Sequence, residues 1–444
     1  MARRSGTDRA VATVEGSPAL GFARNRLQLG LLGLLTLLVG STIGVERVAL
    51  PPLASRDFGV TSILYTVSFI SAFGAVKAVM NLVSGRLSDR HGRRPLLLLG
   101  WAFAVPYVVL IIFAQSWVWV LVANAFLGVN QALTWTMAVT SMIDLAGPGN
   151  RGLAVGINEA CGYVGVGLGG FGAGFLVTLY GLRPAPYLLA LGVAALGMLL
   201  TVWPTKESVG KARAEQVHGD LQRDRLPGDR TTGIEAPDLL WLLRQMSWRH
   251  RGMMAVCQAG MVNKFADSLM IGILPLYLLA RGLKLWQIGL LVGVYAWVWG
   301  LGQVPTGQLA DWLGRRPLIL GGACLVALGV AMFPLLHGFG PWLLAAVVMG
   351  LGMAMIYPNL ISTVGDVAAP RWRGGALGVY RLWRDGGYAV GPLVLGGVAA
   401  VFGLAPAFWV TAGLTIASTL TLALFLGETH PRLGHLATRA GPAS

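Results

Sequence analysis

Long apolar stretches separated by short polar segments dominate this chain. A helix needs about 20 mostly apolar residues to cross the hydrocarbon core of a bilayer, and the pattern predicts twelve such helices. We expect them at residues 27–50, 62–84, 95–115, 117–143, 152–179, 184–203, 252–280, 286–306, 317–337, 341–364, 374–402 and 406–426. Helices are the expected form because unpaired backbone groups are too costly in hydrocarbon.

The composition excludes a water-soluble enzyme built from ordinary domains. Hydrophobic residues make up 55% of the chain and charged residues only 12%, about half the usual share of roughly 25%. The three cysteines each lie inside an apolar run, and all six histidines fall in loops, at helix ends or in the C-terminal tail. A metal site needs clustered ligands, so we expect neither a metal nor another cofactor.

The net charge of +15 is distributed as a topological signal and does not indicate a nucleic-acid partner. Of the 34 lysines and arginines, 25 lie in the termini and the even-numbered loops, whereas only four lie in the odd-numbered loops. Basic residues accumulate on the cytoplasmic side of membrane proteins. We therefore expect a multi-pass protein of the plasma membrane, which in a Gram-negative cell is the inner membrane, with both termini in the cytoplasm.

The two halves of the chain repeat each other at a constant offset of 222 residues. Residues 85–95 match residues 307–317 at seven of eleven positions, and Asp144, Arg151 and Gly152 recur as Asp366, Arg373 and Gly374. Two six-helix bundles related by a pseudo-two-fold axis along the membrane normal are expected. The predicted segments are a cytoplasmic N-terminal tail (1–26), the first bundle (27–203), a cytoplasmic central loop (204–251), the second bundle (252–426) and a cytoplasmic C-terminal tail (427–444).

The eleven-residue element, found twice after the second helix of each half, resembles the signature loop of the major facilitator superfamily. The resemblance covers nearly the whole chain and implies an all-α fold of twelve transmembrane helices in two pseudo-symmetric bundles. It also implies a conformational latch on the cytoplasmic side, although the arginines alone would serve to fix topology. The residues assigned to this latch are Gly85, Asp89, Gly92, Arg93, Arg94, Asp144, Arg151, Asp311, Arg315, Asp366 and Arg373.

A second element resembles the glycine motif on helix 5 of the antiporters of that superfamily. Helix 5 departs from the motif at two positions, helix 11 keeps its proline, and Asn124 stands where drug–proton antiporters usually place an arginine on helix 4. Small residues at such spacings form faces for close helix packing, and we expect these faces to set how tightly the bundles meet. The helix-packing residues are Gly156, Gly165, Gly169, Gly174, Gly378, Gly387, Gly391 and Pro392.

Nine ionisable residues fall inside the predicted spans, where a charge costs about 2.5–3.5 kcal/mol or more and usually faces a cavity or a partner. The carboxylates that could carry a coupling proton are Glu159, Asp267, Asp385 and Glu46. Glu159 is favoured because it lies on the antiporter-like helix and has no basic neighbour one turn away. A permanent salt bridge from Glu159 to Lys77 or Arg381 is the alternative interpretation.

Polar, aromatic and basic residues of the spans are candidates for lining a central cavity. For the uncharged members, ordinary packing is the alternative. The candidates are Lys77, Asn130, Gln131, Trp135, Asn158, Asn263, Lys264, Tyr357, Tyr380, Arg381 and Arg384. Together they indicate a site with room for an apolar or aromatic solute.

These observations favour a secondary active transporter, not an enzyme, that moves a small organic solute by alternating access. Export in exchange for protons is the first hypothesis; uptake by symport, facilitated diffusion or organic-anion exchange on the same fold is the second. A membrane enzyme is disfavoured because the spans carry no catalytic constellation. The expected partners are the solute, protons and the lipid bilayer, and we expect the protein to work as a monomer.

Overall fold

The computed structural model describes residues 21–60, 68–147, 150–208, 210, 238–369 and 372–430, and nearly all of these residues are helical. The first half contains α1 (Phe22–Phe58), α3 (Ser68–His91), α4 (Arg93–Ala102), α5 (Ala104–Ile112), α6 (Trp117–Ala146), α7 (Arg151–Tyr180) and α8 (Ala185–Val202). The second contains α10 (Leu239–Arg244), η2 (Gln245–Arg249), α11 (Arg251–Ser268), η3 (Leu269–Ile273), α12 (Leu274–Ala280), α13 (Leu285–Leu313), α14 (Arg315–Leu335), α15 (Phe339–Val367), α16 (Arg373–Phe402) and α17 (Leu404–Phe425).

Twelve helices of the described chain are long and apolar enough to cross a membrane, as the hydropathy pattern predicts. Two of these spans are interrupted: α4 and α5 form one, and α11, η3 and α12 form another. Several helices run past the apolar stretch that predicts them, because backbone hydrogen bonds continue after the side chains turn polar. Thus α1 extends to Phe58 and α13 to Leu313. The predicted tails and central loop fall largely outside the described residues.

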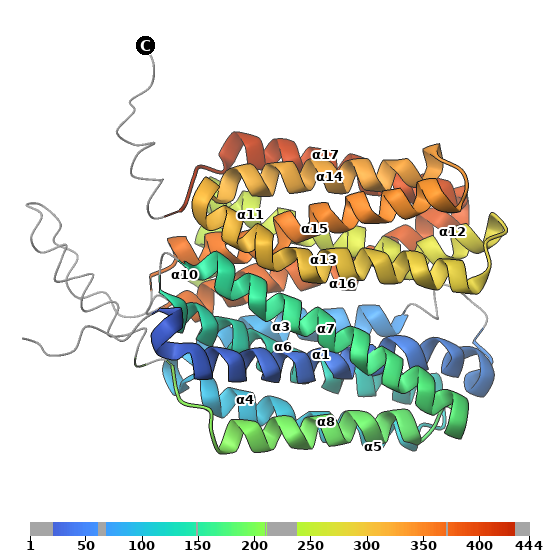
Figure 1. The fold of residues 1–444 in the computed structure, drawn as a ribbon, viewed down its shortest axis with the longest axis horizontal. Helices are drawn as coiled ribbons and strands as arrows, with labels where there is room; N and C mark the ends of the chain where they lie inside the picture. The colour runs from blue at the N-terminus through green and yellow to red at the C-terminus, as the bar shows by residue number, and fades with distance from the viewer. Residues whose placement is uncertain are drawn as a thin grey trace, which may run out of the picture.

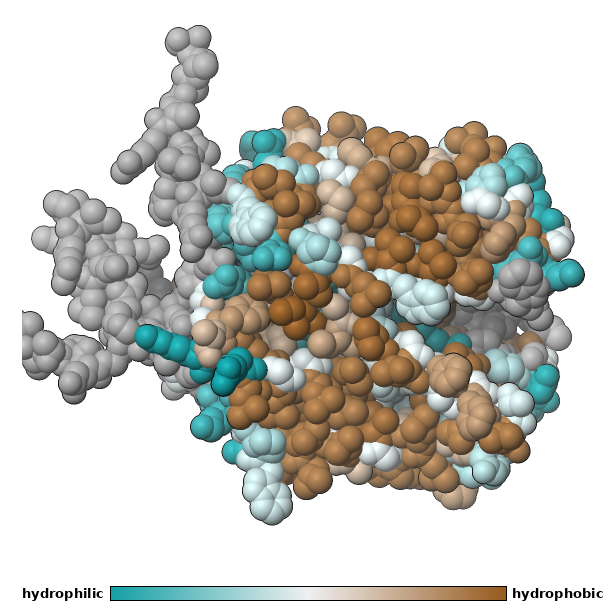
Figure 2. All heavy atoms as spheres, in the orientation of Figure 1, coloured by the Kyte–Doolittle hydropathy of each residue, from teal (hydrophilic) through white to brown (hydrophobic). Residues whose placement is uncertain are grey.

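The helices form two adjacent bundles, with the first half below and the second half above in Figure 1. The bundles meet mainly through two helix pairs, α3 against α16 and α7 against α13. These pairs are equivalent under the 222-residue offset. Large apolar side chains such as Phe171, Val401 and Leu424 are exposed on the outside, and Figure 2 shows a broad hydrophobic band across the visible face, between more polar ends. Such a band is the surface that a bilayer covers.

The structure corrects the role expected for the glycine faces of α7 and α16. Gly156 and Gly378 do lie between the bundles, against the backbone of Gln303 and Asn81 respectively. Their motif partners do not, because nine residues along a helix correspond to two and a half turns and so reverse the face. Gly165 and Gly169 face α1, whereas Gly387 and Gly391 face α11, in each case within one bundle.

Gly174 and Pro392 are the remaining members of the glycine motif. Gly174 meets only a methyl group of Val48 at an ordinary contact distance of 3.8 Å. Pro392 lies inside α16, which continues to Phe402. Gly174 therefore does not set the spacing between the two bundles.

Candidate functional site

A cluster of charged side chains joins the bundles at one end of the molecule, the left end in Figure 1, which we call the motif end. Asp89, near the end of α3, accepts hydrogen bonds from the amides of Gly374 (3.2 Å) and Gly375 (2.8 Å) in the first turn of α16. A carboxylate is stabilised at a helix N-terminus by the unpaired amides and the helix dipole. Asp89 therefore fastens α3 of the first bundle to α16 of the second.

Two arginines extend this first cluster to the end of α6. Arg93 donates to Asp89 at 2.8 Å and to Asp144 at 3.3 Å, and Arg373 on α16 reaches Asp144 at 3.1 Å. Asp144 is fully buried, and both arginines are about 1% exposed. Asp144 thus holds one cation from each bundle.

The second cluster repeats the first at the offset of 222 residues. Asp311 on α13 accepts from the amides of Gly152 (3.2 Å) and Leu153 (3.0 Å) at the start of α7. Arg315 contacts Asp311 at 2.6 Å and Asp366 at 3.0 Å, as Arg93 contacts Asp89 and Asp144. The Arg373–Asp144 contact of the first cluster also has a counterpart, the contact between Arg151 and Asp366.

That remaining contact completes the second cluster. Arg151, at the start of α7, reaches Asp366 on α15 at 3.3 Å. Both side chains are buried. The two bundles are therefore joined twice at the motif end. In the first cluster α3 of the first bundle contacts α16 of the second, and in the second cluster α13 of the second bundle contacts α7 of the first.

Two glutamates that the repeat analysis did not identify complete the motif end. Glu207 accepts from the amides of Arg93 (2.9 Å) and Arg94 (3.0 Å) at the start of α4. Glu428 does the same at the start of α14, accepting from Arg315 (2.9 Å) and Arg316 (3.1 Å). The loops before these helices turn tightly at Gly92 and its counterpart, with φ of 97° at Gly92, a value that favours glycine.

Arg94 departs from its expected place in the latch. Its guanidinium group donates to the carbonyl oxygens of Thr201 and Val202 at the end of α8, within the same bundle. It occupies the C-terminal end of a helix, where cations are favoured. Arg94 thus does not bridge the bundles.

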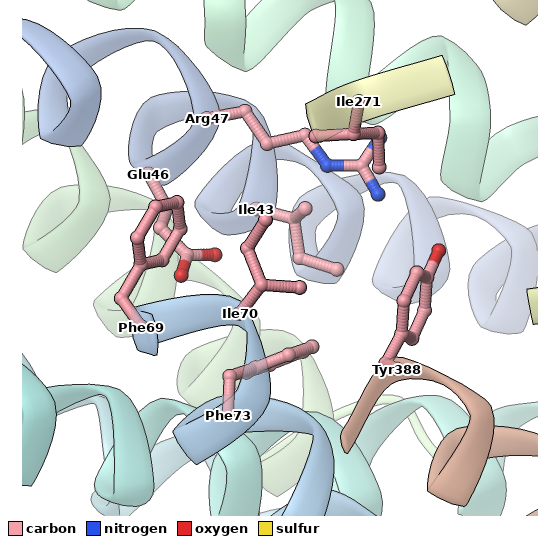
Figure 3. A pocket seen from close by; sticks show the side chains of 8 residues that line it. All are labelled: Ile43, Glu46, Arg47, Phe69, Ile70, Phe73, Ile271 and Tyr388. Atoms are coloured by element: carbon pink, nitrogen blue, oxygen red, sulfur yellow. The ribbon is translucent and has the colours of Figure 1, made fainter. Parts of the chain in front are cut away.

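A small cavity of about 30 Å³, which we call the chamber, lies between the bundles at mid-depth. Its wall contains Ile43, Arg47, Phe73, Lys77, Trp135, Tyr163, Val166, Lys264, Tyr357, Arg384, Asp385 and Tyr388. An adjoining cavity of about 110 Å³ shares Ile43, Arg47, Phe73 and Tyr388 with it, and Figure 3 shows the side chains around this cavity. The molecular surface is hollowed between the bundles at the end opposite the motif end (Figure 2).

One buried ion pair in the chamber centres on Lys264 and Asp267 of α11. The two side chains are 3.2 Å apart, and Tyr295 donates to the other oxygen of Asp267 at 3.1 Å. The hydroxyl of Tyr388 lies 3.2 Å from the Lys264 ammonium and also donates to Asp267. The ammonium faces the rings of Trp299, Tyr357 and Tyr388 with centroids at 4.6 to 4.8 Å. Such geometry adds cation–π attraction, so this pair is well satisfied.

A second buried ion pair is formed by neighbours on α16. Arg384 binds Asp385 through two contacts of 2.7 Å and donates to the hydroxyl of Tyr357 at 2.9 Å. Asn81 on α3 donates to Asp385 at 2.6 Å and accepts from Thr136. Asp385 is thus held by both bundles.

The third carboxylate candidate, Glu159, is held much less completely. One of its oxygens accepts from the indole nitrogen of Trp135 at 2.8 Å and from the side-chain amide of Asn158 at 3.3 Å. The same oxygen lies 3.8 Å from Arg381, the 222-offset counterpart of Glu159. The other oxygen has no hydrogen-bond partner among the described residues, and none of the three guanidinium nitrogens of Arg381 has one either. Both residues are fully buried. Of the two salt bridges considered as the alternative for Glu159, the one to Lys77 does not form, and the one to Arg381 is present as this 3.8 Å contact.

Several residues expected to line the cavity lie outside this wall. Asn130 donates to the carbonyl of Gly100 on α4, and Gln131 donates to Val39 and Thr42 on α1. The others that lie outside it are Asn158, bonded to Thr36 and Glu159; Asn263, bonded to the sulfur of Met353; Tyr380, which packs against Gly260; and Arg381. For these amides the packing alternative describes the structure.

Sequence reasoning missed several aromatic residues around the chamber. Tyr163 and Tyr388 line it directly, and Trp299 and Tyr295 surround the Lys264–Asp267 pair. The offset could have found two of them, because Trp299 and Tyr295 are the counterparts of Lys77 and Phe73. Within the described ranges, no three His, Cys, Asp or Glu side chains are grouped so as to hold a metal ion.

The fold and site define a class: a multi-pass membrane protein with two pseudo-symmetric six-helix halves, a charge-lined chamber between them and charged contacts across one end. The chain matches the sequence profile of the Major Facilitator Superfamily over residues 32–392 and again over 256–444. The protein belongs to the Major Facilitator Superfamily.

Individual relatives match over shorter segments. The quinolone resistance protein NorA of Staphylococcus aureus is 30% identical over 134 residues, which are 30% of this chain and 34% of that protein. The probable L-galactonate transporter of Escherichia coli K12 is 30% identical over 122 residues, 28% of this chain and 27% of that protein. The aligned segments thus span about a third or less of the relatives' length.

One solved structure shares the fold over nearly its entire length. The crystal structure of the human organic anion transporter MFSD10 (TETRAN) superposes with a TM-score of 0.71, covering 90% of this chain and 99% of that one. Its sequence identity is 16%. This similarity supports the fold alone.

Proposed function

We propose that this protein is a secondary transporter that exports a small organic solute in exchange for protons by alternating access. Its family, its chamber at mid-depth and the two equivalent charge clusters support this function. With the motif end on the cytoplasmic side, as the distribution of basic residues predicts, the described conformation faces outward. Breaking both clusters would then open the chamber to the cytoplasm.

The observation that carries the proton-coupling proposal is the incomplete pairing of Glu159. Buried charges regain their desolvation cost only with close contact and complete hydrogen bonding, and the Glu159–Arg381 pair at 3.8 Å has neither. One Glu159 oxygen can take up a proton without breaking a hydrogen bond. By contrast, Asp267 and Asp385 would each have to give up several contacts, so Glu159 is the proposed proton carrier.

The test uses proteoliposomes with an acidic lumen, in which exchange drives solute inward. Each pH unit corresponds to about 1.36 kcal/mol per proton, so one unit supports up to about tenfold accumulation at one proton per solute. We would measure accumulation across a screen of organic solutes that includes a quinolone and L-galactonate, the solutes in the names of the two relatives. Glu159→Gln should retain solute exchange but reduce the accumulation ratio to one.

The matched control is Asp57→Asn, which removes a carboxylate paired with Arg183 at the surface and should leave accumulation unchanged. Accumulation that persists in Glu159→Gln would show that another group carries the proton. A screen in which no solute moves faster than in empty vesicles would refute transport itself.

A further inference from the structure

The cations of the chamber are unequally neutralised. Lys264 is paired with Asp267 and Arg384 with Asp385, as described above. Arg47 and Lys77 line the same chamber, yet neither has a carboxylate oxygen within 4.0 Å among the described residues. Lys77 is only 6% exposed. Its ammonium group lies near the rings of Phe73 (5.1 Å) and Trp135 (5.6 Å), which do not replace a counter-charge.

Glu46 does not supply the missing negative charge, although it is adjacent to Arg47 in the chain. In Figure 3 its carboxylate lies beside Phe69, and the Arg47 guanidinium lies across the cavity on the side of Tyr388. The chamber and its adjoining cavity are lined by four basic side chains but only two acidic ones, Glu46 and Asp385. Counting Asp267 as well, the partner of Lys264, still leaves one more positive than negative side chain. The excess is concentrated at Arg47 and Lys77.

We propose that the transported solute is an organic anion whose negatively charged group binds between Arg47 and Lys77. An unpaired buried charge is costly, and an anion would supply the partner that the protein does not. A cationic solute would be placed beside two unneutralised positive charges and repelled. The proposal rests on the transport function above and adds the chemical class of the solute.

The side chains around the adjoining cavity indicate the chemistry of the uncharged part of the solute. The adjoining cavity, which Arg47 also lines, is surrounded mainly by apolar side chains, namely Ile43, Phe69, Ile70, Phe73 and Ile271. Pockets of this kind bind the apolar body of a ligand while a few polar groups fix its orientation. The solute is thus an amphipathic anion, with a carboxylate or similar group and an apolar or aromatic body.

The test is equilibrium binding to the purified full-length protein in detergent, followed by the shift in thermal unfolding. Three probes share one ring system: 2-naphthoate (anionic), 2-naphthamide (neutral) and 2-naphthylmethylammonium (cationic), with benzoate and dodecanoate as further anions. At least one anion should raise Tm in a concentration-dependent manner, and the neutral and cationic probes should not. Lys77→Met should weaken anion binding about tenfold or more, the effect of losing a charged hydrogen bond.

Further variants separate a binding role from a structural one. Lys77→Arg should retain anion binding, and Lys206→Met, which removes an exposed lysine, should not affect it. Without ligand, Lys77→Met should be at least as stable as the parent, because it removes an unpaired buried charge. Arg47→Gln tests the same site independently and should also weaken binding.

The proposal is overturned if no anion of the set binds, if the amide or amine binds as tightly as the naphthoate, or if Lys77→Met and Arg47→Gln both retain full anion affinity. Binding in detergent requires no proton gradient. A protein that binds anions but shows no proton-driven accumulation would therefore contradict the proposed coupling and leave the anion site intact.

Discussion

Neutralising Asp144 tests whether the charge clusters hold the motif end closed. This fully buried carboxylate contacts Arg93 at 3.3 Å and Arg373 at 3.1 Å, one from each bundle. Removing one partner from a buried ion pair costs about 3–5 kcal/mol. A complete inversion of a 99:1 equilibrium needs about 5.5 kcal/mol. Half of that, about 2.7 kcal/mol, brings a 99:1 equilibrium to equality. If the contacts exist only in the closed state, Asp144→Asn should therefore make the open state at least as populated as the closed one.

The assay is a distance measurement between spin labels on opposite bundles. Arg90 and Trp312 are exposed, equivalent positions at the motif ends of α3 and α13, and the three native cysteines would be replaced beforehand. The parent should give one short distance, and Asp144→Asn should add a longer population. Asp366→Asn, the counterpart in the second cluster, should produce the same change because it removes the equivalent contacts, to Arg151 and Arg315.

A loss of stability without a change in distance would refute this reasoning. The matched control is Phe333→Ala, which truncates a fully buried ring at the end of α14 remote from Arg315. It should cost a similar 3–5 kcal/mol without opening the motif end. If Asp144→Asn and Phe333→Ala lower Tm equally and both leave the distances unchanged, the cluster stabilises the fold and not a conformational state.

Two further predictions concern packing and buried charge. Gly378→Ala should lower Tm, because the added methyl group would overlap the carbonyl of Asn81 across the bundle interface, whereas Gly174→Ala should leave Tm unchanged; equal effects would contradict the assigned faces. Lys264→Met and Asp267→Asn should each destabilise by about 3–5 kcal/mol, and the double variant should recover most of that loss. Additive losses in denaturant unfolding would show that the two groups act independently.

The number and order of the spanning helices could be predicted because hydropathy and the cost of unpaired backbone in lipid leave few alternatives. The 222-residue repeat also predicted which helices of the two halves are equivalent. Helix ends were less accurate, as at Phe58 and Leu313, because a helix continues into water without an apolar signal. The prediction that Gly165 and Gly387 lie between the bundles was wrong. Small residues indicate that another helix packs closely, but they do not indicate which helix it is.

The sequence predicted which kinds of residue form the candidate site, but not how these residues are paired with one another. Charges inside spans identified Lys77, Lys264 and Asp385 because such residues are rare in lipid. Amides such as Asn130 carried no comparable signal, since a buried amide is satisfied equally well by a neighbouring carbonyl. The sequence also gave no indication that Lys77 lacks a carboxylate partner, because pairing depends on how the two bundles meet.

Glu207 and Glu428 follow the last helix of their respective bundles, yet each is bonded to the backbone at the start of that bundle's third helix. The chain leaving either bundle is therefore attached beside Asp89 or Asp311. Mechanical load on either segment, from a fused domain or a bound macromolecule, would act directly on the first turn of α4 or α14. Reporter fusions placed close behind Glu428 consequently need a flexible spacer if the contacts of Glu428 with α14 are to stay undisturbed.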